Sequence, residues 1–264
     1  MGGEVSFVAL GSRMRAIPEV QTLGVKPNYH DYTPRERQMI NQAKLILYPS
    51  LNYAQFFTTA GRKIFPSVET YLYADEKIKQ TTLFNLLEIP HPRTRFYYSR
   101  KKADILDDFT FPFIAKIPRA SSMGKGVFKI TNLPELEQYL RVVKVGYIQE
   151  YLPHSRDLRV VLINYRCVLA YWRKCAPGNF RANISQGGEI DFDNVPEEAI
   201  GLAEKYARRC KFNDVGLDLL LHDDSWYIIE ANMQYGREGF RKKKMVLKEV
   251  IREKLLSGEL FSSP

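Results

Sequence analysis

The sequence lacks any apolar segment long enough to cross a membrane. None of its apolar runs approaches the roughly 18 to 20 residues that a bilayer-spanning helix requires. Its N-terminus also lacks a charged region followed by a secretory hydrophobic core. We therefore expect a cytoplasmic protein that has no membrane partner.

Cysteine and histidine are both scarce. The three cysteines, Cys167, Cys175 and Cys210, are odd in number and show no short metal-binding or redox spacing, so we expect free thiols without a chemical role. The four histidines have no visible catalytic partner, and we expect all of them at the surface. The chain also lacks repeats, low-complexity segments, a Walker loop and a dinucleotide-binding fingerprint.

The composition is otherwise ordinary for a globular protein, with 45% hydrophobic and 26% charged residues, but the net charge is +9. This excess attracts anions such as nucleotides, acidic peptides or nucleic acids. Because the basic residues are scattered and no nucleic-acid-binding module is visible, we expect no nucleic-acid partner. The densest basic run, Arg241 to Lys244, is expected to begin a helix with Leu247, Val250 and Ile251 on its apolar side. It forms either a solvated helix face or a basic wall for an acidic substrate.

The most informative segment, Val215 to Asn232, has the pattern of a β-hairpin that carries three oxygen ligands. Strand side chains alternate between faces, so a turn centred near Asp224 would put Asp218 directly opposite Glu230, with Asn232 on the same face. The other face of the return strand is predicted to carry Tyr227, Ile229 and Ala231. Two carboxylates and an amide oxygen suit a hard cation such as Mg²⁺ or Mn²⁺. The alternative is that both carboxylates are solvated on an open sheet face.

A second polar region suits phosphate binding. Lys116 ends an apolar strand and precedes the segment Ser121 to Gly126. The small residues of this segment, including Ser122 and Gly124, let backbone N–H groups approach phosphate oxygens, and the lysine supplies positive charge. The alternative is an ordinary turn between two strands.

Three further polar groups follow along the chain. The first ends a strand and offers a carboxylate and backbone groups to a base or ribose: Gln149, Glu150 and Tyr151. The second begins the next strand, where an internal salt bridge is the alternative explanation: Asp157 and Arg159. The third contains arginines that can chelate phosphate oxygens: Arg173, Arg181 and Asn183.

Taken in order, these segments resemble the ATP-grasp superfamily, and most closely its RimK-like branch of ribosomal-protein glutamate ligases and related amino-acid ligases. The resemblance covers residues 75 to 239. Its matches are Asp75-Glu76-Lys77, Ile89-Pro90-His91-Pro92-Arg93-Thr94, Pro112-Phe113-Ile114-Ala115-Lys116, Gln149-Glu150-Tyr151, Asp157-Leu158-Arg159, Phe180-Arg181-Ala182-Asn183, Gly187-Gly188, Gly216-Leu217-Asp218-Leu219 and Glu230-Ala231-Asn232. One departure is the loop Met233 to Gly239, where relatives usually have small residues followed by Pro-Gly.

The resemblance implies a role for each group of residues. ATP phosphates would contact Lys77, Lys116 and the loop that contains Ser122 and Gly124. The adenine end would contact Glu150 and Tyr151, beside Gln149, and the ribose would contact Asp157. The phosphate and acyl site would contain Arg173, Arg181 and Asn183. Magnesium would be bound by Asp218, Glu230 and Asn232.

The resemblance also implies an α+β fold, in which the two lobes of an ATP-grasp domain follow a short α/β domain. We expect the N-terminal domain over residues 1–72 and the ATP-grasp domain over 73–264, with a lid lobe at about 90–146 and a metal-binding lobe at about 147–264. Apolar spacing predicts helices near Pro34–Gln42, around Leu133–Val142 and over Glu197–Cys210.

The implied activity is ATP-dependent ligation. A carboxylate takes the γ-phosphoryl group of ATP, and an amine then displaces phosphate from the acyl phosphate to form an amide. Glutamate is the expected amino acid, and the other substrate would be a carboxylate or amine, including an acidic peptide or protein. The alternatives are a small-molecule kinase on the same scaffold and a non-catalytic nucleotide-binding regulator. A homo-oligomer is left open.

Overall fold

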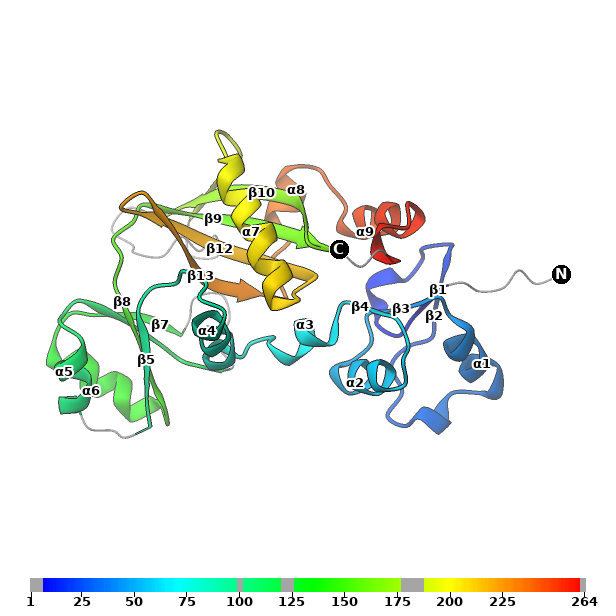
Figure 1. Ribbon diagram of the computed structural model, residues 1–264, viewed down its shortest axis with the longest axis horizontal. Coiled ribbons are helices and arrows are strands. Elements are labelled where there is room, and N and C mark those ends of the chain that lie inside the picture. Colours follow the sequence, from blue (N-terminus) through cyan, green and yellow to red (C-terminus); the bar gives the residue numbers. More distant parts are fainter. Residues whose placement is uncertain (1–6, 99–101, 120–125, 177–187, 262–264) are drawn as a thin grey trace.

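The structure is a computed structural model that describes residues 7–98, 102–119, 126–176 and 188–261 (Figure 1). The described chain forms a parallel four-stranded sheet, an antiparallel four-stranded sheet and an antiparallel five-stranded sheet. Helices pack on all three sheets. The predicted α+β class is confirmed, with a short α/β unit before the two antiparallel sheets.

The N-terminal unit has the strand order β2-β1-β3-β4, and its strands are β1 (Phe7–Ala9), β2 (Val20–Thr22), β3 (Leu45–Leu47) and β4 (Ile64–Phe65). Its helices are η1 (Ser12–Met14), η2 (Tyr29–Asp31), α1 (Pro34–Gln42), α2 (Leu51–Thr59) and α3 (Val68–Leu72). The strands are short and almost wholly apolar because both faces of this sheet are covered. The predicted helix Pro34–Gln42 is present as α1.

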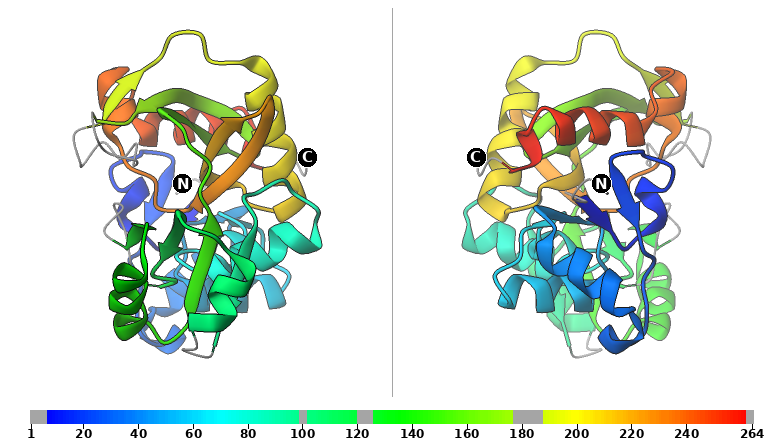
Figure 2. Two further views of the ribbon diagram at one scale, coloured as in Figure 1. Left: turned by 90° about the vertical axis from the view of Figure 1, so that its left-hand side faces the viewer. Right: turned by 90° about the vertical axis from the view of Figure 1, so that its right-hand side faces the viewer.

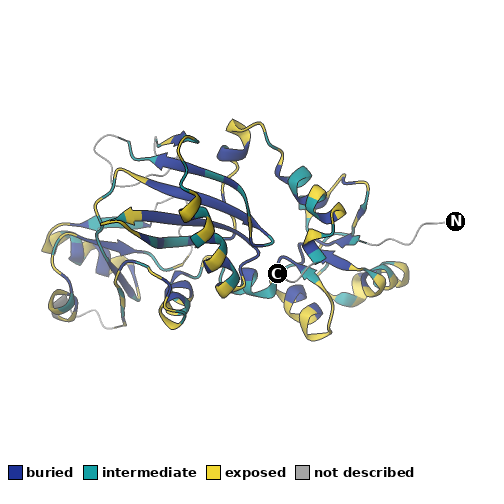
Figure 3. Ribbon diagram, turned by 45° about the horizontal axis from the view of Figure 1, so that its top comes forward, coloured by how far each residue is buried: buried dark blue, intermediate teal, exposed yellow. Residues whose placement is uncertain are grey.

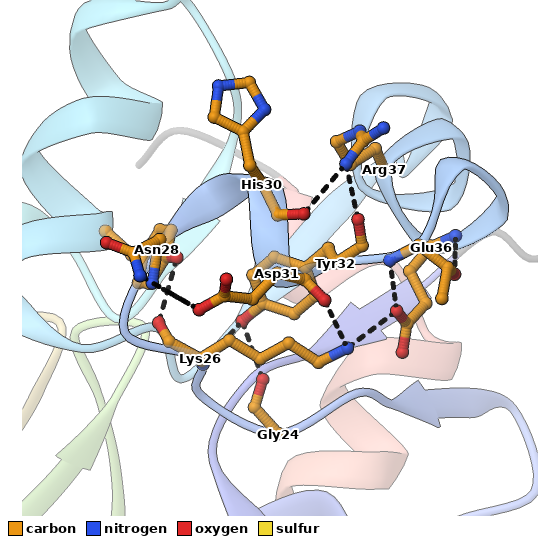
Figure 4. A network of polar contacts seen from close by, with 10 residues as sticks. Gly24, Lys26, Asn28, His30, Asp31, Tyr32, Glu36 and Arg37 are labelled. Atoms are coloured by element: carbon orange, nitrogen blue, oxygen red, sulfur yellow. Dashed lines mark hydrogen bonds and ion pairs between the residues drawn. The ribbon is translucent and has the colours of Figure 1, made fainter.

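A polar network holds the connection between β2 and α1 (Figure 4). Lys26 Nζ donates to the carbonyl oxygen of Asp31 at 3.1 Å and to Glu36 Oε2 at 2.8 Å. Glu36 Oε2 also accepts from the backbone N–H of Thr33 at 2.7 Å, which completes a capping box at the start of α1. The network therefore fixes both the loop and the helix that follows it.

The second sheet, in the order β5-β8-β6-β7, forms the lobe that we call the lid lobe. Its strands are β5 (Thr94–Tyr97), β6 (Phe113–Lys116), β7 (Val127–Ile130) and β8 (Gly146–Glu150), and its helices are α5 (Lys102–Asp108) and α6 (Leu133–Val142). Residues from α5 and α6 pack on this sheet in one apolar core that includes Ile105, Phe113 and Leu136. The predicted helix Leu133–Val142 is present as α6.

The largest sheet has the order β11-β10-β9-β12-β13. Its strands are β9 (Arg156–Ile163), β10 (Arg166–Lys174), β11 (Glu189–Asp191), β12 (Asp214–His222) and β13 (Ser225–Asn232). One face packs against α7 (Glu197–Cys210), where the predicted helix is again present. The other face shares a core with the N-terminal sheet and with α9 (Leu247–Leu256), which lies beside that sheet in Figure 2. The central strands are buried while the helices expose their outer sides (Figure 3).

Helix α4 (Lys77–Leu86) lies where the lid lobe meets the largest sheet (Figure 1). Its Thr81 Oγ1 is 2.7 Å from the phenolic oxygen of Tyr147 on β8, and its Gln80 bonds to the backbone of Ala231 on β13. One turn of α4 therefore contacts both lobes.

The C-terminal helix differs from the sequence-based expectation. The basic run does not begin a helix but ends α8 (Glu238–Lys242), and α9 starts separately at Leu247. Lys244 has a positive φ of 55°, and the N–H of Met245 donates to the carbonyl oxygen of Phe240 at 2.9 Å. This left-handed C-terminal cap ends α8 and separates the two helices. In the described part of the chain, no helix combines the length and apolarity needed to span a bilayer.

Candidate active site

A cavity lies between α4, the lid lobe and strand β13. Its lining mixes charged and polar groups with apolar side chains: Lys77, Gln80, Thr81, Phe84, His91, Lys116, Tyr147, Gln149, Ile228, Ile229 and Glu230. Four residues predicted from the sequence as nucleotide or metal ligands are therefore brought together here, namely Lys77, Lys116, Gln149 and Glu230. They come from segments separated by as many as 153 positions.

Two lysines concentrate positive charge in this cavity. Lys77, at the start of α4, places its Nζ 3.3 Å from Glu230 Oε1. Lys116, at the end of β6, donates from Nζ to the carbonyl oxygen of Ile229 at 3.3 Å. Burial lowers the pKa of Lys116 to about 8, while Glu230 acts in the opposite direction and Lys77 adds to the lowering. An anion entering the cavity would meet two buried ammonium groups, and its charge would favour the protonated form of Lys116.

The cavity adjoins a buried ion network centred on Asp218. Arg159 donates to both carboxylate oxygens of Asp218, with its Nη2 2.9 Å from Oδ2. Arg173 Nη2 lies 3.0 Å from the same Oδ2, and Arg173 Nε donates to Asp157 at 2.6 Å. Burial alone would raise the pKa of Asp218, but Arg159 and Arg173 together hold it below its ordinary value. Asp218 therefore stays ionised. The suggested salt bridge between Asp157 and Arg159 is not the one formed: Arg159 pairs with Asp218, and Asp157 pairs with Arg173.

The register of the hairpin places Asp218 directly across from Glu230 and Gly216 across from Asn232. The pairing Asp218–Glu230 was predicted, but from a turn centred near Asp224 and regular pairing, which is not how the hairpin forms it. The turn is centred between Asp223 and Asp224, both with positive φ, so regular pairing would have put Asp218 opposite Ile229. A bulge at Ile229 shifts the register by one residue and restores the pairing.

The bulge also changes which residues share a face. The expected apolar set Tyr227, Ile229 and Ala231 is wrong, because the buried core face of β13 instead carries Trp226, Ile228 and Ala231. Alternation from Ala231 back to Ile228 skips the extra residue at the bulge.

The donor set is compatible with a divalent cation. Asp218 Oδ2 accepts from Arg159, Arg173 and Asn232 Nδ2, whereas Oδ1 accepts only from Arg159 among the described residues. Because a carboxylate oxygen has two lone pairs, Oδ1 keeps the capacity to bind one cation. Glu230 retains a partly exposed carboxylate opposite it, and rotation of the Asn232 amide would offer a third oxygen. No cluster of three or more His, Cys, Asp or Glu residues that could hold a metal occurs in the described ranges.

Gln149, on the cavity wall, donates from Nε2 to Thr94 Oγ1 at 2.9 Å. Other predicted residues lie elsewhere. Glu150 Oε1 accepts from the backbone N–H of Arg93 at 2.5 Å. Tyr151 places its ring 4.1 Å from Lys129 Nζ. Neither Glu150 nor Tyr151 lines the cavity just described. Ser122, Gly124, Arg181 and Asn183 lie outside the described residues.

Sequence reasoning missed one face of α4 and one histidine. The missed helix face is polar and inward: Gln80, Thr81 and Phe84 follow Lys77 at intervals of three, four and seven residues. That helical spacing was a usable signal, obscured because two of the residues are polar. His91, expected at the surface without a partner, instead lines the cavity, and its Nδ1 lies 2.7 Å from the carbonyl oxygen of Ile89.

Comparison with known proteins identifies the family. The family model for the RimK-like ATP-grasp domain matches residues 74–255. The chain is 28% identical over 208 residues to coenzyme gamma-F420-2:alpha-L-glutamate ligase of Methanocaldococcus jannaschii, an alignment that covers 75% of this chain and 71% of that protein.

Two solved structures share the fold. One is a RimK domain protein ATP-grasp from Sphaerobacter thermophilus, with a TM-score of 0.66, 13% identity and coverage of 95% of this chain and 99% of that one. The other is the ATP-grasp ligase PsnB complexed with minimal precursor, Mg and ADP, with a TM-score of 0.70, 13% identity and coverage of 96% and 98%. The chain belongs to the RimK-like ATP-grasp family, whose members use ATP and Mg²⁺, and is an ATP-dependent carbon–nitrogen ligase.

Proposed function

We propose that this ligase adds glutamate, as an amino-acid substrate, to a peptide, protein or small-molecule acceptor. The observation that carries the proposal is the meeting of Lys77, Lys116 and Glu230 in one cavity beside the ionised Asp218. The name of the M. jannaschii relative, an alpha-L-glutamate ligase, supports the choice of amino acid. A cytoplasmic location stays a prediction.

The residues divide the work between charge and position. Lys77 and Lys116 would bind the triphosphate and offset its charge while the γ-phosphoryl group moves to the substrate carboxylate, which releases ADP. The amine of the other substrate would then attack the carbonyl carbon of the acyl phosphate, lose a proton and expel phosphate. Asp218, Glu230 and Asn232 would hold Mg²⁺, which would supply additional positive charge to the phosphate oxygens. Arg173 keeps Asp218 ionised in this arrangement.

The test is ADP release by the purified protein with ATP and Mg²⁺. Release that requires both a carboxylate and an amine, with an amide found by mass spectrometry, would support the proposal, and glutamate should be the most effective amino acid. A phosphorylated alcohol without an amide would indicate a kinase. Tight ATP binding without turnover over a broad substrate panel would indicate a regulator.

We further propose that the second substrate is acidic. Helix α8 directly follows the loop after β13 and carries an exposed basic surface on and around it. This surface consists of Arg237, Arg241, Lys242, Lys243 and Lys244. Only Arg241 has an acidic partner among the described ion pairs of this group, namely Glu238. An acidic substrate would be attracted to this surface.

Reversing the charge of Lys242, Lys243 and Lys244 to Glu tests the surface. The KM for an acidic acceptor peptide should rise about tenfold at low salt, with kcat unchanged, and the difference should shrink at high salt because exposed charges are screened. A neutral peptide with the same reactive group is the control. An equal KM for the acidic peptide in both proteins would leave the basic run as a solvated helix face.

A further inference from the structure

Strand β13 is an edge strand of the largest sheet. Backbone groups on its outer side form hydrogen bonds with the segment around Pro90 and with the Gln80 side chain instead of with another strand. The N–H of Ile228 donates to the carbonyl oxygen of Pro90 at 2.9 Å. Farther along, Gln80 Nε2 donates to the carbonyl oxygen of Ala231 at 2.8 Å, and Gln80 Oε1 accepts from the N–H of Ala231 at 3.2 Å. The Gln80 side chain therefore pairs with both backbone groups of one residue, as a neighbouring strand would.

The surroundings of Gln80 allow only one orientation of its amide. The side chain is 3% exposed, and its nitrogen donates to the carbonyl oxygens of both Tyr73 and Ala231, each at 2.8 Å. Exchanging the amide oxygen and nitrogen would direct an acceptor at two acceptors. The contact is therefore specific for a group that can donate twice and accept once.

The position of this contact connects it to the site. Ala231 lies between Glu230 and Asn232, and Gln80 lies one helical turn after Lys77, on the same face of α4. Lys77 Nζ in turn lies 3.3 Å from Glu230 Oε1. A single turn of α4 thus holds both the backbone between two proposed ligands and the side chain of one of them.

We propose that Gln80 is a positioning residue that holds Glu230 and Asn232 in place for the divalent cation and fixes their distance from Lys77. This inference rests on the proposed function, because it assumes that Glu230 and Asn232 bind the cation. Gln80 would act without binding the cation, because its amide nitrogen and oxygen are already bonded to the backbone of Tyr73 and Ala231. Its effect passes through the backbone of Ala231, in the same way that groups around metal ligands orient them in other sites.

Two variants test the proposal. Gln80→Glu keeps the shape of the side chain but directs an oxygen at two carbonyl oxygens, and Gln80→Met keeps the length without any polar pairing. Thr82→Ala is the matched control, because Thr82 is exposed on the same helix and donates only to the carbonyl oxygen of Ile78 among the described contacts. Circular dichroism and thermal melting first establish that each variant is folded.

The readout is ADP affinity measured by calorimetry with saturating Mg²⁺ and again with EDTA. In the wild type and in Thr82→Ala, Mg²⁺ should strengthen binding by the same factor. In both Gln80 variants that factor should fall by about tenfold, whereas the affinity in EDTA should match the wild type. A general loss of stability would not selectively change the ratio between the ADP affinity with Mg²⁺ and the ADP affinity in EDTA.

Three outcomes would overturn the assignment or its foundation. Folded Gln80 variants with a wild-type Mg²⁺ factor would show that the side chain does not position the ligands. Failure of both variants to fold would make Gln80 a determinant of folding instead. If the wild type itself gained no affinity from Mg²⁺, the proposed metal site would fail before Gln80 was considered.

Discussion

Asp214 and Asp218 lie four residues apart on β12, on the same face of the strand, and are 1% and 4% exposed. Their surroundings differ. Asp218 is held by two guanidinium groups, whereas Asp214 accepts from the phenols of Tyr48 and Tyr235 and from a single arginine, Arg13. The guanidiniums lower the pKa of Asp218, while burial raises that of Asp214 despite its three donors.

The two aspartates therefore have different roles: Asp218 carries charge at the candidate site, whereas Asp214 joins two parts of the fold. Arg13 and Tyr48 come from the N-terminal unit, so Asp214 connects that unit to the largest sheet. Asp218 takes its guanidinium donors from β9, the adjacent strand, and from β10, the strand beyond it, and it lies opposite Glu230 in the candidate site. Gly216, between them, lets both sets coexist, because a Cβ there would lie 2.9 Å from Tyr235 Cβ and 3.1 Å from Arg159 Cδ.

The largest expected effect comes from Asp218→Asn. Loss of the carboxylate charge leaves two buried guanidinium groups with too little compensation, so turnover should disappear and unfolding free energy should fall by about 3 kcal/mol or more. Activity assays and denaturant unfolding measure the two quantities. A stable, active variant would remove the distinction between the two aspartates.

Glu230→Gln should remove turnover without the stability cost. The Glu230 side chain is 32% exposed and its pair with Lys77 spans 3.3 Å, so unfolding free energy should change by less than about 1 kcal/mol. Ligation should fall by about a hundredfold or more, since a charge next to the transferring phosphate is lost. Glu249→Gln on α9 is a control for loss of a partly exposed carboxylate. Normal turnover in Glu230→Gln would contradict the proposed metal site.

Asp214→Asn should lower unfolding free energy by about 2 kcal/mol at neutral pH and leave kcat unchanged at a temperature where the variant is folded. Because the folded state raises the pKa of Asp214 above its ordinary value of 3.8, its contribution to stability is greatest when it is protonated and declines as the pH rises through the folded pKa. The stability advantage of the wild type over this variant should therefore grow as the pH is lowered from about 7 towards about 4. A pH-independent difference in urea unfolding would contradict the assigned pKa direction.

Tyr235→Phe should have the smallest effect. The ring would remain packed against Phe240, and only the phenolic donor to Asp214 Oδ1 at 2.6 Å would be lost. We expect a loss of about 1 kcal/mol in unfolding free energy and unchanged turnover, measured by the same assays. A large loss of turnover would show that Asp214 also shapes the active site.

Local patterns were sufficient for three of the helices and for the polar segments that identify the family. The helices Pro34–Gln42, Leu133–Val142 and Glu197–Cys210 lie where apolar spacing predicted helices, and the first two begin at a side-chain N-cap. The start of α9 could not be predicted in this way. Lys244 adopts a left-handed conformation that no local pattern of basic residues indicates.

The sequence alone determined the types of group available: two lysines for phosphate, carboxylates and an amide at strand spacing, and arginines near them. The tertiary structure decided which of these groups meet. Asp218 lies opposite Glu230 because of a bulge at Ile229. It pairs with Arg159 on the adjacent strand β9 and with Arg173 on β10, the next strand beyond β9. The physical reason is that residue type and spacing encode local conformation, whereas pairing between distant strands depends on register and burial across the whole fold.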